Sequence, residues 1–111
     1  MICQGGDLLS GDGSWSESIW GGEFEDENFI FRHTGPGVLS MMNKGPDSNG
    51  SQFQFTFVEL PSLDCRYVAF GCVVDRESME VLEKISRCGS DHGLPTKEVT
   101  IQSHSLIFTH F

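Results

Sequence analysis

Side chains that could support metal or nucleophilic chemistry are scattered along this sequence rather than clustered. The cysteines show no Cys-x-x-Cys spacing, and with the histidines they complete no tetrahedral zinc pattern. These residues are Cys3, Cys65, Cys72, Cys88, His33, His92, His104 and His110. The acidic run at Glu25, Asp26 and Glu27 lies between phenylalanines without further oxygen ligands, so we interpret it as part of a structural loop. We therefore predict no bound metal and no cofactor.

Two further side chains with reactive groups are interpreted as structural. His33 lies just before the turn Gly35-Pro36-Gly37, and we expect it to be hydrogen-bonded there. Cys88 comes at the end of a predicted helix, where the helix dipole disfavours a thiolate. Neither residue is therefore predicted to take part in catalysis.

The amide side chains have a more suggestive placement. Gln52 and Gln54 alternate with Phe53, Phe55 and Phe57, which predicts a half-buried strand with one polar and one aromatic face. We expect the phenylalanine face to be part of the core.

Gln4 is a polar residue in the apolar segment that opens the chain. Its position favours a role in a site over a role in packing.

The elements that would position these side chains are mostly strands. Besides the strand at 52–57, the sequence predicts a short strand at 38–43, a buried strand at 67–74 interrupted by Gly71, and a last strand at 99–101. The glycine- and serine-rich stretch 5–22 predicts a long loop, and long loops in compact domains are often functional.

One segment has the pattern of an amphipathic helix. Asp75 is suited to cap its N-terminus. Met79, Leu82 and Ile85 recur every three residues, and Gly89 is suited to end the helix. We predict about three turns of helix, which with the strands indicates a mainly β fold, a barrel or sandwich capped by a helix.

Length and charge narrow the class of protein. The 111 residues suffice for one domain. The formal net charge of −9 repels nucleic acid and anionic lipid surfaces, so neither is an expected partner. The sequence contains no run of about eighteen apolar residues and no secretory signal pattern, so no membrane span is expected. We expect a monomer in the cytoplasm or nucleus.

Five motifs, in this order and at these spacings, together resemble one family, the cyclophilin-type peptidyl-prolyl cis–trans isomerases. They are QGGD at 4–7, FEDENF at 24–29, HTGPGVLSM at 33–41, NGSQF at 49–53 and VAFG at 68–71. The match runs almost without gaps from Ile2 to Gly71 and continues more loosely to Ile101. The last ten residues depart from the usual ending of the family.

The resemblance implies a closed antiparallel β-barrel of eight strands with a helix over each end. Aligned on that plan, residues 1–111 form a single domain that lacks the opening third, the first strands and the first helix. A remainder of five strands would leave sheet edges unpaired and phenylalanines uncovered. The domain is therefore expected to be N-terminally truncated.

The resemblance also implies the reaction, isomerisation of X-Pro peptide bonds. The barrier of about 18–20 kcal/mol arises from the partial double bond of the amide. A donor aimed at the proline nitrogen weakens that resonance, while a pocket grips the ring. In cyclophilins an arginine several residues before the QGGD segment is the key donor. That position falls before Met1, and no arginine of this chain matches it; the arginines are Arg32, Arg66, Arg76 and Arg87.

Several groove positions are implied by the same resemblance. Gln4 matches the glutamine that binds substrate and orients the arginine. Asn43 matches the asparagine whose backbone holds the residue before proline, and Gln52 matches a groove glutamine. The other matched positions line the proline pocket, flank Asn43 or form the turn that gates a side pocket: Leu63, Met42, Lys44, Gly13 and Ser14.

Other positions depart from the family pattern. Gln54 stands where the pocket floor has a phenylalanine, Ser62 where an aromatic is usual, and Tyr67 where a histidine lies beside the proline ring. Met1 replaces another pocket phenylalanine, and Ile2 stands where methionine is common. Loss of an aromatic floor removes about 1.5–3 kcal/mol of apolar contact. We therefore predict weakened proline binding.

Three functional hypotheses follow. The first is a divergent isomerase that acts on proline-containing peptides and proteins and so promotes protein folding. The alternative is a catalytically weak or inactive cyclophilin-like module that binds proline-containing segments. The third is a truncated product with no activity. Cyclosporin is a typical ligand of the family, and Ser62 and Gln54 count against its binding here.

Overall fold

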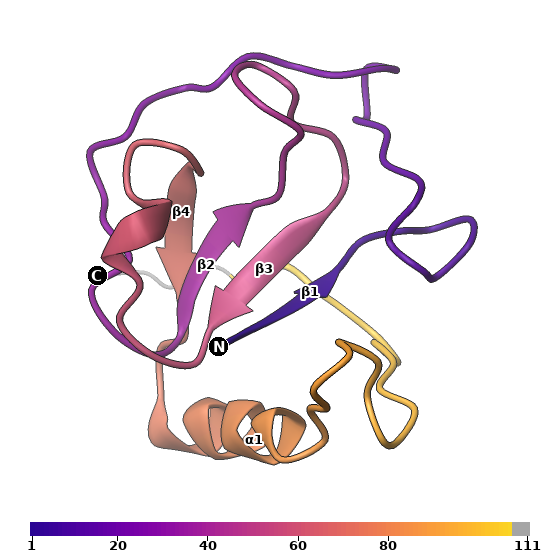
Figure 1. Ribbon diagram of the computed structural model, residues 1–111, viewed down its shortest axis with the longest axis vertical. Coiled ribbons are helices and arrows are strands. Elements are labelled where there is room, and N and C mark those ends of the chain that lie inside the picture. The colour runs from indigo at the N-terminus through magenta and orange to yellow at the C-terminus, as the bar shows by residue number, and fades with distance from the viewer. Residues whose placement is uncertain (108–111) are drawn as a thin grey trace.

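The computed structural model describes residues 1–107, and its centre is a four-stranded antiparallel sheet in the order β1-β3-β2-β4. Long loops lie beyond one end of the strands, and a single α-helix lies across the other end (Figure 1). The elements are β1 (Ile2–Gly5), β2 (Val38–Met41), β3 (Phe53–Thr56), a 3-10 turn η1 (Pro61–Leu63), β4 (Ala69–Cys72) and α1 (Arg76–Ser86).

Strand register divides the side chains between two faces of the sheet. Gln4 of β1 and Ser40 of β2 both pair with Gln54 of β3, so these three residues form one row. Cys3 and Leu39 pair with Phe55 in the next row, which belongs to the opposite face. The predicted alternation in the third strand is therefore confirmed, with a polar face and an apolar face.

The more deeply buried face of the sheet is the polar one. Gln54 is 1% exposed, and Ser40 and Thr56 are fully buried, whereas Phe53 and Phe55 are only half-buried. The phenylalanine rings meet edge to face with centroids 6.0 Å apart. The prediction that these phenylalanines form the core is wrong for residues 1–107. The buried hydrophobic residues are Leu60, Val68, Ala69 and Leu82.

The polar face can be buried because loops supply hydrogen-bond partners for its side chains. The Thr56 Oγ1 donates to the carbonyl oxygen of Gly35 at 2.7 Å and accepts from the N–H of Val38 at 3.0 Å. A buried polar side chain is tolerated when its hydrogen bonds are satisfied in this way.

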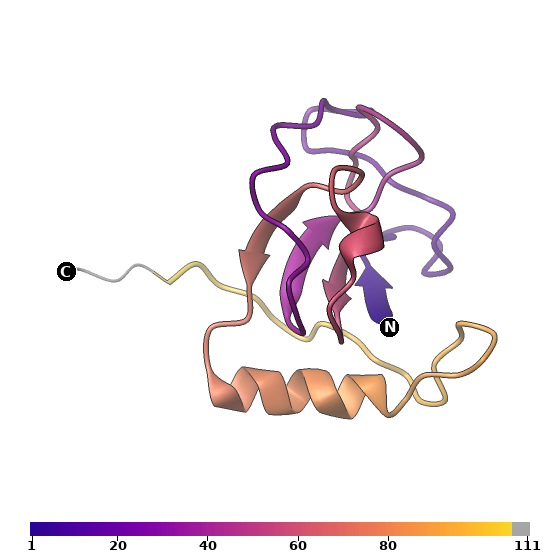
Figure 2. The same cartoon turned by 60° about the vertical axis from the view of Figure 1, so that its left-hand side comes forward.

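The helix is formed as its sequence predicts. Asp75 caps it by accepting the N–H of Ser78 at 2.8 Å, and this hydrogen bond lowers the pKa of Asp75. Leu82 is buried, and Met79 and Ile85 on the same face are half-buried. The helix ends at Ser86, before Gly89. In Figure 2, α1 lies across the ends of the strands.

Gly37 brings the helix close to the sheet. It has a φ of 86°, and a Cβ at this position would lie 2.8 Å from the sulfur of Met79. Its N–H donates to the carbonyl oxygen of Thr56 at 2.7 Å, and its own carbonyl oxygen accepts from Val73 at 2.9 Å. A glycine at this point therefore connects β3, the end of β4 and α1.

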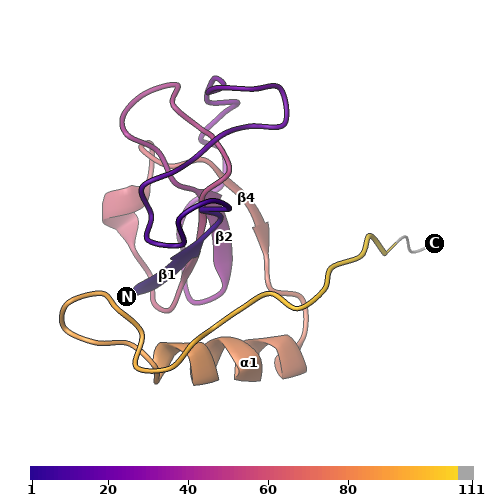
Figure 3. The same ribbon diagram turned by 90° about the vertical axis from the view of Figure 1, so that its right-hand side faces the viewer.

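Two strand predictions need correction. Segment 67–74 yields the short strand β4, which runs through Gly71 without interruption and is largely exposed, with Phe70 54% exposed. The predicted strand at 99–101 does not form, because these residues are exposed and pair with no neighbouring strand. Figures 2 and 3 both show the chain after α1 making a loop and then running back alongside the helix and past the sheet.

The sheet is not closed into a barrel within residues 1–107. β1 pairs only with β3, and β4 pairs only with β2, so one edge of each strand has no partner among the described residues. For this part of the chain, the closed barrel that the resemblance implies is therefore an open sheet, with the unpaired edges expected of the remainder. That further strands and a helix precede Met1 stays a prediction.

Candidate functional site

The first half of the candidate site is a pair of glutamine side chains on β1 and just before β3. The Nε2 of Gln4 donates to the Oε1 of Gln52 at 3.0 Å. The Nε2 of Gln52 donates in turn to the carbonyl oxygens of Gly13 at 2.9 Å and Trp15 at 2.8 Å. Gln52 is 7% exposed, whereas Gln4 is exposed. The structure therefore brings together three predicted site residues, Gln4, Gln52 and Gly13.

The loop that contains Gly13 and Ser14 is ordered by Asp7. The two carboxylate oxygens of Asp7 accept backbone N–H groups from Leu9, Ser10, Asp12, Gly13, Ser14 and Trp15. Burial raises the pKa of Asp7, but these hydrogen bonds lower it by more, so the pKa lies well below its ordinary value. Because Gly13 and Trp15 also accept from Gln52, Asp7 indirectly positions the glutamine pair.

Gly6 and Ser51 hold the start of this loop against β3. Gly6 has a φ of 97°, and a Cβ there would collide with the carbonyl oxygen of Ser51. The Oγ of Ser51 donates to the carbonyl oxygen of Gly6 at 2.7 Å. The second glycine of the QGGD segment is thus required by close approach of two backbones.

The second half of the candidate site lies around Asn43 and Tyr67. The Nδ2 of Asn43 donates to the carbonyl oxygen of Arg66 at 2.7 Å, and its Oδ1 accepts the N–H of Gly45 at 3.1 Å. The N–H of Tyr67 donates to the carbonyl oxygen of Leu63 at 3.1 Å. Asn43, Leu63 and Tyr67 therefore belong to one hydrogen-bonded unit.

A backbone hydrogen bond joins the two halves. The N–H of Met42 donates to the carbonyl oxygen of Gln52 at 3.0 Å, so the Asn43 loop begins directly beside the glutamine pair. Lys44 lies farther out and is exposed, and its N–H donates to the Oγ of Ser48 at 2.8 Å.

The unit around Leu63 and Tyr67 is anchored by His33 and Asp64. The Oδ1 of Asp64 accepts the backbone N–H of His33 at 2.7 Å and faces its Nδ1 at 2.9 Å. These hydrogen bonds lower the pKa of Asp64. The carbonyl oxygen of His33 accepts the N–H of Leu60 at 3.0 Å. The structural role predicted for His33 is confirmed, but its partners lie in the 60–64 segment rather than in the glycine-proline turn.

Three positions that depart from the family pattern differ in their burial. Gln54 is buried beneath the surface of the polar face, and its Nε2 donates to the Oγ of Ser40 at 2.9 Å. This hydrogen bond offsets the free-energy cost of removing the amide from water. Ser62 is exposed in η1, and Ile2 is half-buried on the same strand face as Gln4.

Arg66 introduces a cation that the sequence did not single out. Its guanidinium carbon lies 5.9 Å from the centroid of the Tyr67 ring, within the range of a cation–π contact. Arg66 is exposed, so this contact is a weak one at the rim of the candidate site.

The described part of the chain contains no cluster of metal-ligating side chains. Within residues 1–107, no group of three or more His, Cys, Asp or Glu side chains is arranged to hold a metal ion. His110 lies outside the described residues. The four cysteines are free thiols, and burial raises the pKa of Cys3. None of the helices in residues 1–107 has the length and apolar character needed to cross a membrane.

A comparison with known protein families agrees with the order of motifs in the sequence. A family model described as "Cyclophilin type peptidyl-prolyl cis-trans isomerase/CLD" matches residues 1–106. The chain belongs to this family. The mainly β architecture, with four antiparallel strands and one helix, is consistent with the cyclophilin fold. Isomerase is therefore the general functional class of this cyclophilin-family chain.

Two positioning residues were missed in the sequence of this cyclophilin-family chain. An aspartate followed by a loop rich in glycine and serine is a signal for side chain to backbone hydrogen bonds, so Asp7 could have been found. The pairing of Asp64 with His33 had no such signal, because 31 residues separate the two.

Proposed function

We propose that this chain binds X-Pro segments of polypeptides and accelerates their cis–trans isomerisation weakly, as a peptidyl-prolyl isomerase of the cyclophilin type. Family membership supports the reaction class. The observation that carries the proposal is the 3.0 Å hydrogen bond between Gln4 and Gln52, which places two amides beside the Asn43 loop. A peptide is held by amide donors and acceptors of this kind.

The proposed mechanism needs neither a nucleophile nor a metal. Rotation about the X-Pro bond is easier when one side of the bond is held and the other is free to turn. The exposed amide of Gln4 would bind a substrate carbonyl, and the backbone of Asn43 would hold the residue before proline. Leu63 and Tyr67 would contact the proline ring.

We expect the acceleration to be small for an electrostatic reason. Within residues 1–107, no arginine hydrogen-bonds Gln4 or Gln52, so the glutamine pair lacks a charged donor beside it. Loss of one well-placed donor typically lowers a rate by about 10²–10³. A cation at the rim, such as Arg66, does not replace a donor aimed at the proline nitrogen.

The test is the cis–trans exchange rate of a short Ala-Pro peptide, measured by exchange NMR with the 111-residue chain added. We expect a small rate increase that Gln4→Leu abolishes, because the exposed amide is lost and the Oε1 of Gln52 loses its donor. Gln102→Leu, which makes the same change at an exposed position outside the predicted groove, should leave the rate unchanged. An unaccelerated rate with dispersed protein signals would refute catalysis.

A second candidate function is binding of proline-containing segments without turnover. It is favoured by the engagement of Gln52, whose amide is already bonded to Gln4, Gly13 and Trp15. In this case a peptide titration would shift the amide signals of Asn43 and Gln52 while the exchange rate stayed at its uncatalysed value. If no peptide shifts those signals, both candidate functions fail.

A further inference from the structure

The rim of the candidate site carries two cations in a chain that is otherwise acidic. Lys44 follows Asn43 directly, and Arg66 precedes Tyr67. Both of these basic side chains are exposed. The chain as a whole has 7 Lys and Arg residues against 16 Asp and Glu residues, so the rim differs in sign from the average surface.

Arg66 is held at this rim by its backbone and by its side chain. Its carbonyl oxygen accepts the Nδ2 of Asn43 at 2.7 Å, and its N–H donates to the carbonyl oxygen of Leu63 at 3.2 Å. Its guanidinium carbon lies 5.9 Å from the centroid of the Tyr67 ring. A planar guanidinium that rests against an aromatic ring can still present its N–H fork to an anion. Arg66 therefore places a cation beside the ring that would contact proline.

The carboxylates nearest to these cations in sequence are engaged elsewhere. Within residues 1–107, the only contact between an acidic and a basic side chain at salt-bridge distance joins His33 and Asp64, at 2.9 Å. Asp47, three residues after Lys44, accepts the N–H of Asp26 at its Oδ1, at 2.9 Å. Neither cation at the rim therefore has an acidic partner in the described part of the chain.

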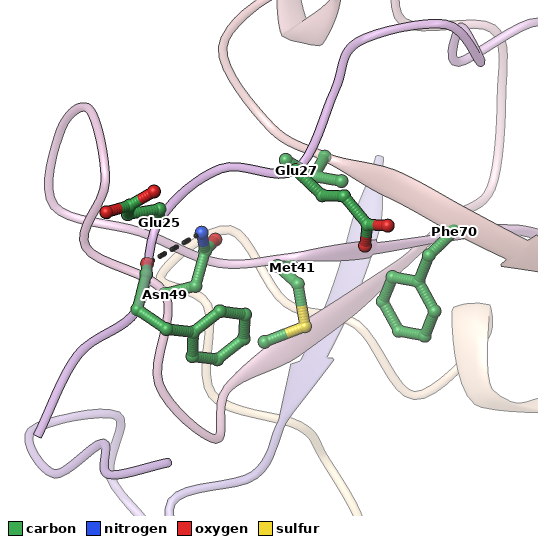
Figure 4. Close-up of a pocket in the computed structure, with 7 residues that line it drawn as sticks. Glu25, Glu27, Met41, Asn49 and Phe70 are labelled. Atoms are coloured by element: carbon green, nitrogen blue, oxygen red, sulfur yellow. Dashed lines mark hydrogen bonds between the residues drawn. The ribbon is translucent and has the colours of Figure 1, made fainter. Parts of the chain in front are cut away.

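The acidic side chains of the 24–29 segment belong to another part of the molecule. Glu25 and Glu27 line a separate hollow of about 230 Å³ together with Met41 and Phe70, as Figure 4 shows. None of the residues that line this hollow is a predicted groove residue. These carboxylates are therefore not part of the proposed groove.

We propose that Arg66, assisted by Lys44, makes the groove select X-Pro segments in which the residue before proline is acidic. This inference rests on the proposed function. The backbone of Asn43 would hold the residue before proline, and the side chain of Asn43 is bonded to Arg66, so we place the carboxylate at that residue. The fork of N–H donors in a guanidinium matches the two oxygens of a carboxylate.

The overall charge of the chain favours a ligand with a single negative charge. A net charge of −9 repels every anion at long range. A phosphate group, with a charge of about −1.5 to −2 at pH 7, is repelled more strongly than a carboxylate. Exposed ion pairs are weak, so the selectivity should be about threefold.

The test is an NMR titration of the 111-residue chain with end-blocked peptides at low ionic strength. We expect Ala-Glu-Pro-Ala and Ala-Gln-Pro-Ala both to shift the backbone amide signal of Asn43. The glutamate peptide should bind about threefold more tightly than the glutamine peptide, which has the same shape without the charge. Salt at about 0.5 M should remove the difference, because exposed charges are then screened.

Matched variants test the role of Arg66. Arg66→Gln removes the charge and keeps the backbone carbonyl group that Asn43 uses, and it should abolish the preference for the glutamate peptide. Arg87→Gln makes the same change in charge at the exposed end of α1 and should keep the preference. Both changes are at exposed residues, so an unaltered amide spectrum will show that the fold is kept.

Four outcomes would overturn the proposal while the proposed function stands. Equal binding of the glutamate and glutamine peptides would show that charge is not selected. A preference that survives Arg66→Gln would exclude Arg66 as its source. Tighter binding of Ala-Ala-Pro-Glu would place the anion after proline, and tighter binding of a phosphoserine peptide would identify phosphate as the ligand. If no peptide shifts the Asn43 signal, the proposed function fails and this proposal fails with it.

Discussion

Asp7 illustrates how a single carboxylate can organise a functional loop. Its oxygens accept six backbone N–H groups, those of Leu9, Ser10, Asp12, Gly13, Ser14 and Trp15. The carbonyl oxygens of the same loop accept from Gln52. The glutamine pair thus depends on an ionised carboxylate that lies outside the groove itself.

The pH dependence of this loop follows from the pKa of Asp7. Burial raises that pKa, but the backbone hydrogen bonds lower it by a larger amount. The pKa in the folded state therefore lies below that in the unfolded state. A carboxylate whose pKa is lower in the folded state stabilises the fold at pH values above its pKa in the unfolded state. This stabilisation is lost as the pH falls toward the pKa in the folded state.

We therefore expect Asp7 to remain ionised at pH 3.8, the ordinary pKa of an aspartate. The carboxyl carbon shift of Asp7, followed by NMR during acid titration, measures this directly. Asp7→Asn should release the loop at neutral pH and broaden the side-chain amide signals of Gln52. A midpoint for Asp7 at or above 3.8 would contradict the account.

At the scale of elements, the helix and the sheet depend on each other. α1 has one buried residue, Leu82, and this residue lines a hollow of about 240 Å³ together with Phe55 of β3 and Val73. The helix is short, and helices of this length are marginal without tertiary packing. Its stability therefore comes from the contact with the apolar face of the sheet.

Leu82→Ala should lower the free energy of unfolding by about 2–4 kcal/mol, because a buried side chain is lost and its space is only partly refilled. Val74→Ala is the control, since Val74 lies just before the helix, lines no hollow and is 93% exposed, and it should cost less than about 0.5 kcal/mol. Urea denaturation of both variants, followed by circular dichroism, gives the comparison. Similar midpoints for the two variants would mean that α1 does not dock as described.

At the scale of the whole molecule, the apolar face of an open sheet remains partly uncovered. Phe70 on β4 is 54% exposed, and the hydrophobic residues that are buried in residues 1–107 are only Leu60, Val68, Ala69 and Leu82. Stability is a small difference between apolar burial and chain entropy, so a core of this size leaves little margin.

We expect the 111-residue chain to unfold at low denaturant concentration and to bind a hydrophobic dye in its native state, since the phenylalanine face is accessible. Far- and near-ultraviolet circular dichroism during thermal unfolding, with dye fluorescence at low temperature, would test this. A sharp transition that coincides in both spectral ranges without dye binding would contradict it. It would also count heavily against the hypothesis of an inactive truncated product.

Local rules determined much of this molecule from the sequence. The helix was predicted because Asp75, Met79, Leu82 and Ile85 obey spacing rules that act within a few residues. The strand at 53–56 was predicted from alternation of side-chain type, and the motif order indicated the family. Each of these signals depends only on neighbours along the chain.

The tertiary structure decided which face of the sheet is buried. Alternation separates Gln54 from Phe55 but does not say which side the loops cover. That depends on hydrogen bonds accepted by residues such as Gly13 and Gly35, which lie far from β3 in sequence. Long-range pairing also decided the two strands predicted near the C-terminus, because a strand forms only where a neighbouring strand can hydrogen-bond its backbone. β4 pairs with β2, whereas residues 99–101 pair with no strand. Sequence therefore determined the local elements and the family, and long-range pairing determined which face is buried and which sheet edges stay open.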